Sequence, residues 1–226
     1  MNTTKKEFLH GIKDELPILV GVIPFGMIYG ILALDAGLSK AEAQAMSAIV
    51  FAGSAQFMLV QLAAIGTPAL VMVLTGFIIN LRHALYSASV APRVRHLSPL
   101  WKVFLAYLLT DEAYAVTITH YAQEGEIRHK HWYYLGAGIA LWTAWQISTA
   151  VGVFLGAQIP SGWSLDFTLA LTFIALLVPT LKDRSDLLVV LSAGTVSVLA
   201  IGLPYKLNLI LAAVVGIAIG LWSERK

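Results

Sequence analysis

The chain has 226 residues and a formal net charge of +2; 58% of its residues are hydrophobic and only 12% are charged, with a mean hydropathy of +0.77. A soluble domain of this length needs a charged surface, so this is the composition of a membrane protein. The basic residues form no patch interleaved with aromatic side chains, so nucleic-acid binding is unsupported. Because the chain has no cysteine, it has no disulfides or thiolate metal sites.

The N-terminal residues 1–15 are charged and amphipathic. They lack the apolar core and the small-residue cleavage site of a signal peptide, so we predict no cleaved leader. We expect this stretch to be a cytoplasmic segment that precedes the first membrane-spanning helix.

Eight apolar windows follow, divided by glycine, proline or charged residues. They cover residues 16–36, 43–65, 68–91, 101–121, 132–157, 167–181, 187–203 and 207–222. A bilayer crossing needs about 20 apolar residues, and the windows lack the alternating pattern of barrel strands. Backbone groups in lipid must be satisfied internally, so we predict an all-α, polytopic membrane protein with seven to eight segments. Residues 1–226 are expected to form one transmembrane domain, with the polar site blocks in 16–121 and the remaining segments in 132–222.

Positive charges give conflicting signals about topology. Basic residues near the N-terminus and after the third window both predict a cytoplasmic location: Lys5, Lys6, Lys13, Arg93, Arg95 and Lys102. Three full crossings cannot satisfy both. Either one segment turns back inside the membrane, or this protein departs from a statistical rule. The candidate for turning back is the window 43–65, because Gly53 and Ser54 lower its helix propensity.

Two stretches of 25 residues, which begin at Tyr29 and Val151, share the order apolar segment, glycine-containing break, apolar segment. Many transporters consist of such repeats, with the binding site at their interface. An internal repeat is therefore a hypothesis for this chain, although apolar sequences match one another easily.

The first polar block, Gly53-Ser54-Ala55-Gln56, lies within an uncharged run of 39 residues. A helix interrupted there would free N–H groups to bind an anion such as a carboxylate. The alternative is ordinary packing of small residues, with Gln56 hydrogen-bonded across a helix interface.

The second block, NLRHALYSAS, covers residues 80–89 and predicts a helix with polar side chains on two sides. On a helical wheel one face carries Arg82, Tyr86 and Ser89, and the opposite face carries Asn80, His83 and Ser87. A charge at the bilayer centre costs about 2.5–3.5 kcal/mol, so this segment should not face lipid. The alternative is that Arg82 extends from a helix end to the membrane interface.

The third block contains Thr110, Asp111, Glu112 and Tyr114. Adjacent helical residues point about 100° apart, so the two carboxylates cannot serve one partner in the same way. The three blocks together offer an anion partner, a cation partner and aromatic walls, which would fit a zwitterion with an apolar side chain. His83 and an intramembrane carboxylate are candidates for proton coupling. The alternative is a structural Asp111–Arg82 pair between helices.

The three blocks, FAGSAQF, NLRHALY and LTDEAYA, in this order and spacing, resemble the AzlC family. The resemblance covers residues 16–121, while the second half is similar only in its hydrophobic pattern. It implies the large subunit of a two-component secondary exporter of leucine, isoleucine, valine or their analogues in the bacterial cytoplasmic membrane. It also implies a small hydrophobic AzlD-like partner. The family's sequence patterns would fall on Ala52, Gly53, Ser54, Ala55, Gln56, Arg82, His83, Leu85, Tyr86, Asp111 and Glu112. We predict a substrate site formed by Gly53, Ser54, Gln56, Asn80, Arg82, His83, Tyr86, Thr110, Asp111, Glu112 and Tyr114.

Two other functions stay open at this point. The chain carries no phosphate-binding loop, HExxH pair or GxSxG elbow, so we expect no enzyme of those classes and no cofactor. His129 and His131 lie in a charged stretch that reads as a solvated loop rather than a metal site. The alternatives are a membrane enzyme that uses Asp111, Glu112 and His83 on a lipid-soluble substrate, and a non-catalytic assembly subunit.

Overall fold

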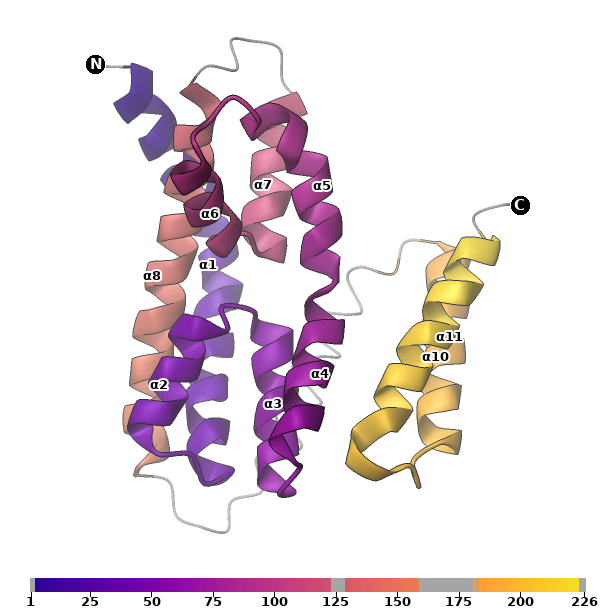
Figure 1. Cartoon of the computed structure of the whole chain (residues 1–226). Helices are drawn as coiled ribbons and strands as arrows, with labels where there is room; N and C mark the ends of the chain where they lie inside the picture. Colours follow the sequence, from indigo (N-terminus) through magenta and orange to yellow (C-terminus); the bar gives the residue numbers. More distant parts are fainter. Residues whose placement is uncertain (1–2, 123–128, 159–180, 182, 224–226) are drawn as a thin grey trace. The chain divides into compact units, whose positions relative to one another are not determined.

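The computed structural model describes residues 3–122, 129–158, 181 and 183–223. In this part of the chain the regular structure is entirely helical (Figure 1). The helices are α1 (Thr3–Asp35), α2 (Lys40–Ile49), α3 (Gly53–Ala64), α4 (Ala69–Asn80), α5 (Arg82–Val94), α6 (Pro99–Tyr107), α7 (Asp111–Ala122), α8 (Lys130–Gly156), α10 (Arg184–Leu199), α11 (Leu207–Ser223) and a 3-10 turn at Pro204–Lys206. The predicted all-α class is confirmed. The predicted window 167–181 lies almost entirely outside the described residues.

The chain divides into two compact units: residues 1–64 with 76–161, and residues 65–75 with 162–226. In the second unit, α10 and α11 pack against each other. The side-chain amide of Asn208 donates a hydrogen bond to the carbonyl of Ser197 at 3.1 Å, which ties the two helices together. One transmembrane domain over the whole chain stays a prediction.

Helices α1 and α8 form the centre of the first unit and run parallel in close contact. Their backbones approach through glycines: a Cβ added to Gly30 would lie 2.5 Å from the Thr149 carbonyl oxygen. A Cβ on Gly152 would lie 2.1 Å from the Met27 carbonyl oxygen. Small residues permit this approach, and dispersion contacts between the backbones then hold the helices together in an apolar medium.

The paired glycines bear on the hypothesis of an internal repeat. Gly30 and Gly152 occupy equivalent positions in the two aligned stretches, and they contact each other's helices in the same way. Most of the remainder of the second stretch lies outside the described residues. The repeat therefore stays a prediction, now with a matching contact at one aligned position.

Helix α1 includes most of the expected cytoplasmic segment. Residues 3–15 continue without a break into the apolar part of the helix. They also pack: a Cβ on Gly11 would lie 2.0 Å from the Tyr133 carbonyl oxygen, and Glu15 is fully buried. The charged start of the chain therefore forms the first turns of the central helix pair.

The window 43–65 turns back inside the bundle. Helix α2 ends at Ile49, and α3 begins at Gly53 after a short irregular stretch. Helix α3 then follows only the second half of α1, because the Phe57 ring packs on Phe25 and Tyr29 with centroid distances of 5.3 and 6.2 Å. Figure 1 shows both short helices in the half of the unit where α1 ends.

The window 101–121 is also broken, which was not predicted. Helix α6 ends at Tyr107 and α7 begins at Asp111. Helix α7 follows the first half of α1, where His120 Nε2 lies 2.9 Å from Glu7 Oε2. The sequence does hold a helix-start signal here: Thr110 Oγ1 accepts a hydrogen bond from the Ala113 N–H, and two acidic residues follow it.

The window 68–91 divides into two helices that together are long and apolar enough for one broken span. Helices α4 and α5 meet at Leu81 with a bend of 41°. Two hydrogen bonds of the 3-10 type join the helices there. The Leu81 N–H donates to the Ile78 carbonyl, and the Ala84 N–H donates to the Leu81 carbonyl. Of the three breaks, only the one at Gly53 was anticipated.

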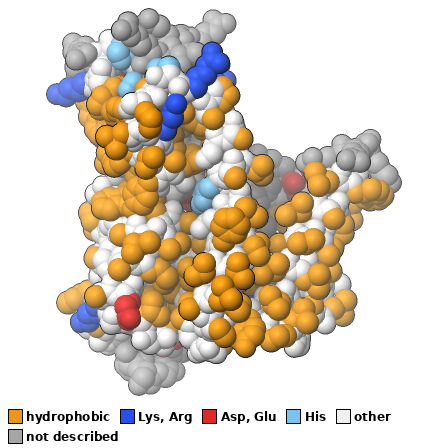
Figure 2. All heavy atoms as spheres, viewed as in Figure 1, with side chains coloured by type: hydrophobic (Ala, Val, Ile, Leu, Met, Phe, Trp, Pro, Cys, Tyr) orange, Lys and Arg blue, Asp and Glu red, His pale blue; other side chains and the backbone are white. Residues whose placement is uncertain are grey.

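The turned-back segment resolves the conflict in the charge signals. Because α2 and α3 enter and leave at one end, the N-terminus of α1 and the turn between α5 and α6 share the other end. There the Arg93 guanidinium lies 5.9 Å from the Tyr121 ring centroid, and His96 lies 6.3 Å from His131. Figure 2 shows Lys and Arg side chains gathered at this end, which the positive-inside rule assigns to the cytoplasm.

If the segment 43–65 turns back, both of its ends should be accessible from the same side of the membrane. The chain has no cysteine, so single cysteines can be introduced at Lys40 and Ala64 without a background signal. Both should react with a membrane-impermeant maleimide from the same side of the membrane, opposite to a cysteine at Lys6. Labelling of Lys40→Cys and Ala64→Cys from opposite sides would show a full crossing instead.

The glycine contacts predict the effect of adding a single methyl group. Gly30→Ala places a Cβ against the α8 backbone, which cannot move away easily, and should destabilise the protein by about 1–3 kcal/mol. Gly21→Ala on the same helix meets nothing within 4 Å and should be neutral or stabilising. Thermal melting in detergent measures both variants, and equal melting temperatures would contradict the proposed close packing.

Candidate functional site

The three polar blocks meet where α3, α5 and α7 begin. Arg82, the first residue of α5, places Nη1 2.6 Å from Asp111 Oδ2. Its Nη2 donates a hydrogen bond to Ser54 Oγ at 2.5 Å. One guanidinium therefore links one residue from each block.

Each partner lies in the first turn of its helix. Ser54 is the second residue of α3, and Asp111 is the first residue of α7. The first N–H groups of a helix have no intrahelical acceptor and carry a partial positive charge. The acidic side chains of α7 compensate for this charge at their own helix, while the start of α3 gives the site hydrogen-bond donors for an anion.

An aromatic stack borders the ion pair. The rings of Tyr86 and Tyr114 are stacked with a centroid distance of 4.5 Å, and the Tyr114 hydroxyl donates to Ser89 Oγ at 3.0 Å. Arg82, Tyr86 and Ser89 thus all face α7, as the helical wheel predicts for one side of α5. This face carries the contact between α5 and α7.

The tips of the two turned-back segments are also connected. The Tyr107 hydroxyl donates a hydrogen bond to the Ala48 carbonyl at 2.6 Å, and the Trp142 indole N–H donates to Tyr107 at 2.7 Å. The carbonyl at the end of α2 is thereby satisfied by the end of α6. The two broken segments, which enter from opposite ends of the unit, meet near its middle.

Several buried polar atoms around the pair have no hydrogen-bond partner in the described part of the chain. They are Arg82 Nε, Asp111 Oδ1, His83 Nε2 and Asn80 Oδ1. Buried polar groups are nearly always satisfied, so such a group of atoms calls for an explanation. The relative solvent exposure of the Asp111 side chain is 38%, so a molecule from outside can reach the ion pair.

The remaining predicted site residues lie around this centre in different ways. Gly53 faces the Trp145 ring, where an added Cβ would lie 3.1 Å away. Gln56 points towards α1 and lies fully buried beside the Tyr29 hydroxyl. Thr110 caps α7, and Glu112 interacts electrostatically with both members of the ion pair.

Sequence reasoning missed one charged residue near this site. Glu15 belongs to the stretch expected to be cytoplasmic, yet its side chain is completely buried. The sequence carries a weak signal for this position, because Glu15 lies one helical turn after Gly11 and no charged residue follows it before Asp35. Glycine and glutamate therefore share the face of α1 that packs against its neighbours.

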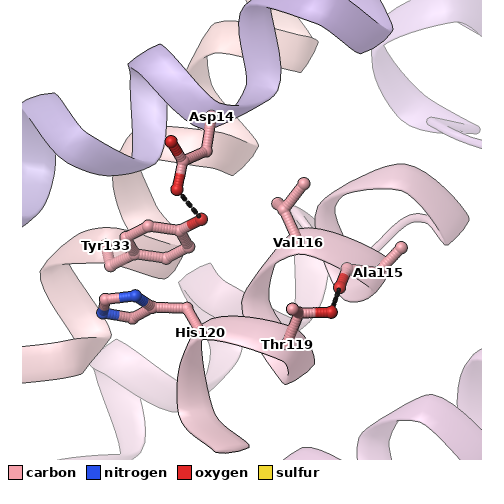
Figure 3. A pocket seen from close by; sticks show the side chains of 6 residues that line it. All are labelled: Asp14, Ala115, Val116, Thr119, His120 and Tyr133. Atoms are coloured by element: carbon pink, nitrogen blue, oxygen red, sulfur yellow. Dashed lines mark hydrogen bonds between the residues drawn. The ribbon is translucent and has the colours of Figure 1, made fainter. Parts of the chain in front are cut away.

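A pocket of about 270 Å³, lined by both polar and apolar side chains, opens at the positively charged end of the unit. Figure 3 shows its lining residues from α1, α7 and α8: Asp14, Ala115, Val116, Thr119, His120 and Tyr133. The Tyr133 hydroxyl donates to Asp14 Oδ2 at 2.8 Å, and its ring stacks on His120 with a centroid distance of 3.8 Å. No group of three or more His, Asp or Glu side chains within the described ranges is arranged to hold a metal ion.

Comparison with known proteins gives a consistent result. The sequence profile described as AzlC protein matches residues 17–159. Inner membrane protein YgaZ of Escherichia coli is 29% identical over 85% of this chain and 80% of its own length. An uncharacterized membrane protein of Archaeoglobus fulgidus is 31% identical over 78% of this chain and 77% of its own. The branched-chain amino acid transport protein AzlC of Bacillus subtilis is 26% identical over 72% and 63%. No solved structure matches.

The matched region contains all three polar blocks and the helix starts that hold them. The predicted location, as a multi-pass protein of the cytoplasmic membrane, is confirmed by the membrane proteins among its relatives and by helices apolar enough to span a bilayer. The chain therefore belongs to the AzlC family and is a membrane protein with a role in transport.

Proposed function

We propose that this chain is the large subunit of a secondary exporter of leucine, isoleucine, valine or similar amino acids. The observation that carries this proposal is the Arg82 guanidinium, held between Ser54 and Asp111 where three helices begin. Broken helices around charged groups are the usual architecture of substrate sites in secondary transporters.

The unsatisfied atoms match the chemistry of an amino acid. Arg82 Nε can bind a carboxylate, while Asp111 Oδ1 and Asn80 Oδ1 can accept hydrogen bonds from an ammonium group. The stacked Tyr86 and Tyr114 rings offer an apolar wall for a branched side chain. The Bacillus subtilis relative, a branched-chain amino acid transport protein, supports this substrate class.

Export, proton coupling and a partner subunit complete the proposal. The positively charged end of the first unit would face the cytoplasm, and substrate would leave towards the opposite side. Protonation of His83 or of a buried carboxylate would couple transport to the proton gradient. The resemblance to the AzlC family supports a small hydrophobic AzlD-like partner.

The two rival functions predict different products and different mutant behaviour. A membrane enzyme that uses Asp111, Glu112 and His83 would release a chemically altered compound, whereas an exporter releases its substrate unchanged. A non-catalytic assembly subunit would need the Arg82–Asp111 pair only to hold its helices together. Mass spectrometry of the released compound separates the first rival from the proposal.

Removal of the guanidinium tests the site directly. Arg82→Ala should abolish efflux of preloaded radiolabelled leucine and valine from cells that express this chain and its small partner, because the carboxylate loses its counter-ion. Lys102→Ala, an exposed basic residue at the cytoplasmic end, is the matched control and should leave efflux unchanged. Efflux at the normal rate from Arg82→Ala, with the protein inserted, would remove Arg82 from the mechanism.

An exchange of the two charges separates a binding role from a structural role. Arg82→Asp combined with Asp111→Arg keeps the ion pair and should restore the amount of folded protein relative to either single variant. Because the orientation towards the substrate is reversed, leucine efflux should remain lost. Recovery of both folding and efflux would favour the assembly subunit. Fluorescence-detected gel filtration and the efflux assay measure the two properties separately.

A further inference from the structure

Glu15 is a carboxylate without a partner in the interior of the first unit. Its relative exposure is 0%, and neither carboxylate oxygen has a hydrogen-bond partner among the described residues. An isolated buried charge is costly, and a carboxyl group can avoid this cost by holding a proton. The role of Arg82 and Asp111 in the proposed transport does not account for Glu15.

The titratable groups around Glu15 come from three helices. From α7 it interacts electrostatically with Glu112, and from α8 with Tyr133. On α1 itself, His10 and Asp14 lie within about one and a half turns, and His10 Nε2 lies 3.4 Å from Asp14 Oδ2. Helix α3 has no titratable side chain, and Lys40 and Glu42 of α2 are exposed near the other end of α1. No described group among these neighbours supplies a cation directly to Glu15.

Two nearby carboxyl groups favour the binding of a proton by one of them. Two negative charges in an apolar interior repel each other, so the pair is more stable when one group is neutral. Glu112 interacts with Arg82 and Asp111 as well as with Glu15. It therefore links the buried glutamate electrostatically to the proposed substrate site.

The pocket lies near this pair, although neither Glu15 nor Glu112 is one of its lining residues. Val116 and His120 line the pocket and lie one and two turns after Glu112 on the same face of α7. Asp14 lines it beside Glu15, and Tyr133, an electrostatic neighbour of Glu15, forms its wall (Figure 3). The pocket opens at the positively charged end, so protons would arrive from the proposed cytoplasmic side.

We propose that Glu15 is a proton-binding site electrostatically coupled to Glu112, and that the pocket of Asp14, His120 and Tyr133 connects it with the aqueous phase. The assignment of this proton as the coupling ion rests on the proposed function. The proton moves between a Glu15 carboxylic acid and bulk water, so no oxidant or reductant is involved. Binding of the proton itself can be tested without transport.

Infrared difference spectroscopy of the purified full chain, titrated with acid and base, tests the proton site. Wild type should show the C=O stretching band of a buried carboxylic acid near neutral pH, and Glu15→Gln should remove it. Glu42→Gln, an exposed control, should retain the band. In Glu112→Gln the band should disappear at a lower pH than in wild type, because a neighbouring negative charge is removed. This variant also tests the proton site if Glu15→Gln does not fold. A wild-type spectrum without the band, or a band unchanged in both Glu15→Gln and Glu112→Gln, would overturn the proposal.

Leucine transport in proteoliposomes tests the coupling role separately. Wild type with its partner should exchange leucine without a pH gradient and accumulate it when a gradient is applied. Glu15→Gln should keep the exchange and lose the stimulation by the gradient, because its side chain cannot release a proton. Full stimulation in Glu15→Gln would overturn the coupling role. If wild type moves no leucine at all, the proposed function fails, and the infrared result alone decides whether Glu15 binds a proton.

Discussion

A positive charge inside an apolar bundle is the constraint on which the first unit depends. A charge near the middle of a bilayer costs about 2.5–3.5 kcal/mol even on lenient scales, so the Arg82 guanidinium needs partners within the protein. Asp111 and Ser54 provide them from two other helices. All three residues lie at helix starts, so the segments that carry them must break near the same depth. The breaks in the helices therefore place Asp111 and Ser54 where they can compensate for the Arg82 charge.

The central pair of α1 and α8 makes this arrangement possible. Its glycines bring the two backbones into direct contact, which leaves room for short helices around the pair. Helix α3 follows the second half of α1 and α7 follows the first half. Two half-length helices from opposite ends thus point their N-termini at one region, where positive helix ends and the Arg82–Asp111 pair can act on the same ligand.

Adjacent carboxylates on α7 serve two different partners. Successive helical residues point about 100° apart, and in the structure Asp111 pairs with Arg82 while Glu112 lies in electrostatic range of Glu15. The proposed substrate site and the proposed proton site therefore lie on neighbouring faces of one short helix. A proton added to one side of α7 changes the field at the other side. This arrangement gives a physical basis for coupling without a large movement of the chain.

The sequence by itself determined the membrane class, the helical fold, the three polar blocks and the face of α5 that carries Arg82, Tyr86 and Ser89, because composition and helical periodicity are local properties. It also identified Gly53 as a break, since glycine and serine lower helix propensity. The register of α1 against α8 was decided only by tertiary structure. The break before Asp111 and the burial of Glu15 have weak local signals in the sequence, but tertiary structure decided both. Each depends on which distant helix lies alongside, and a charged residue at the edge of an apolar window looks solvated until that neighbour covers it.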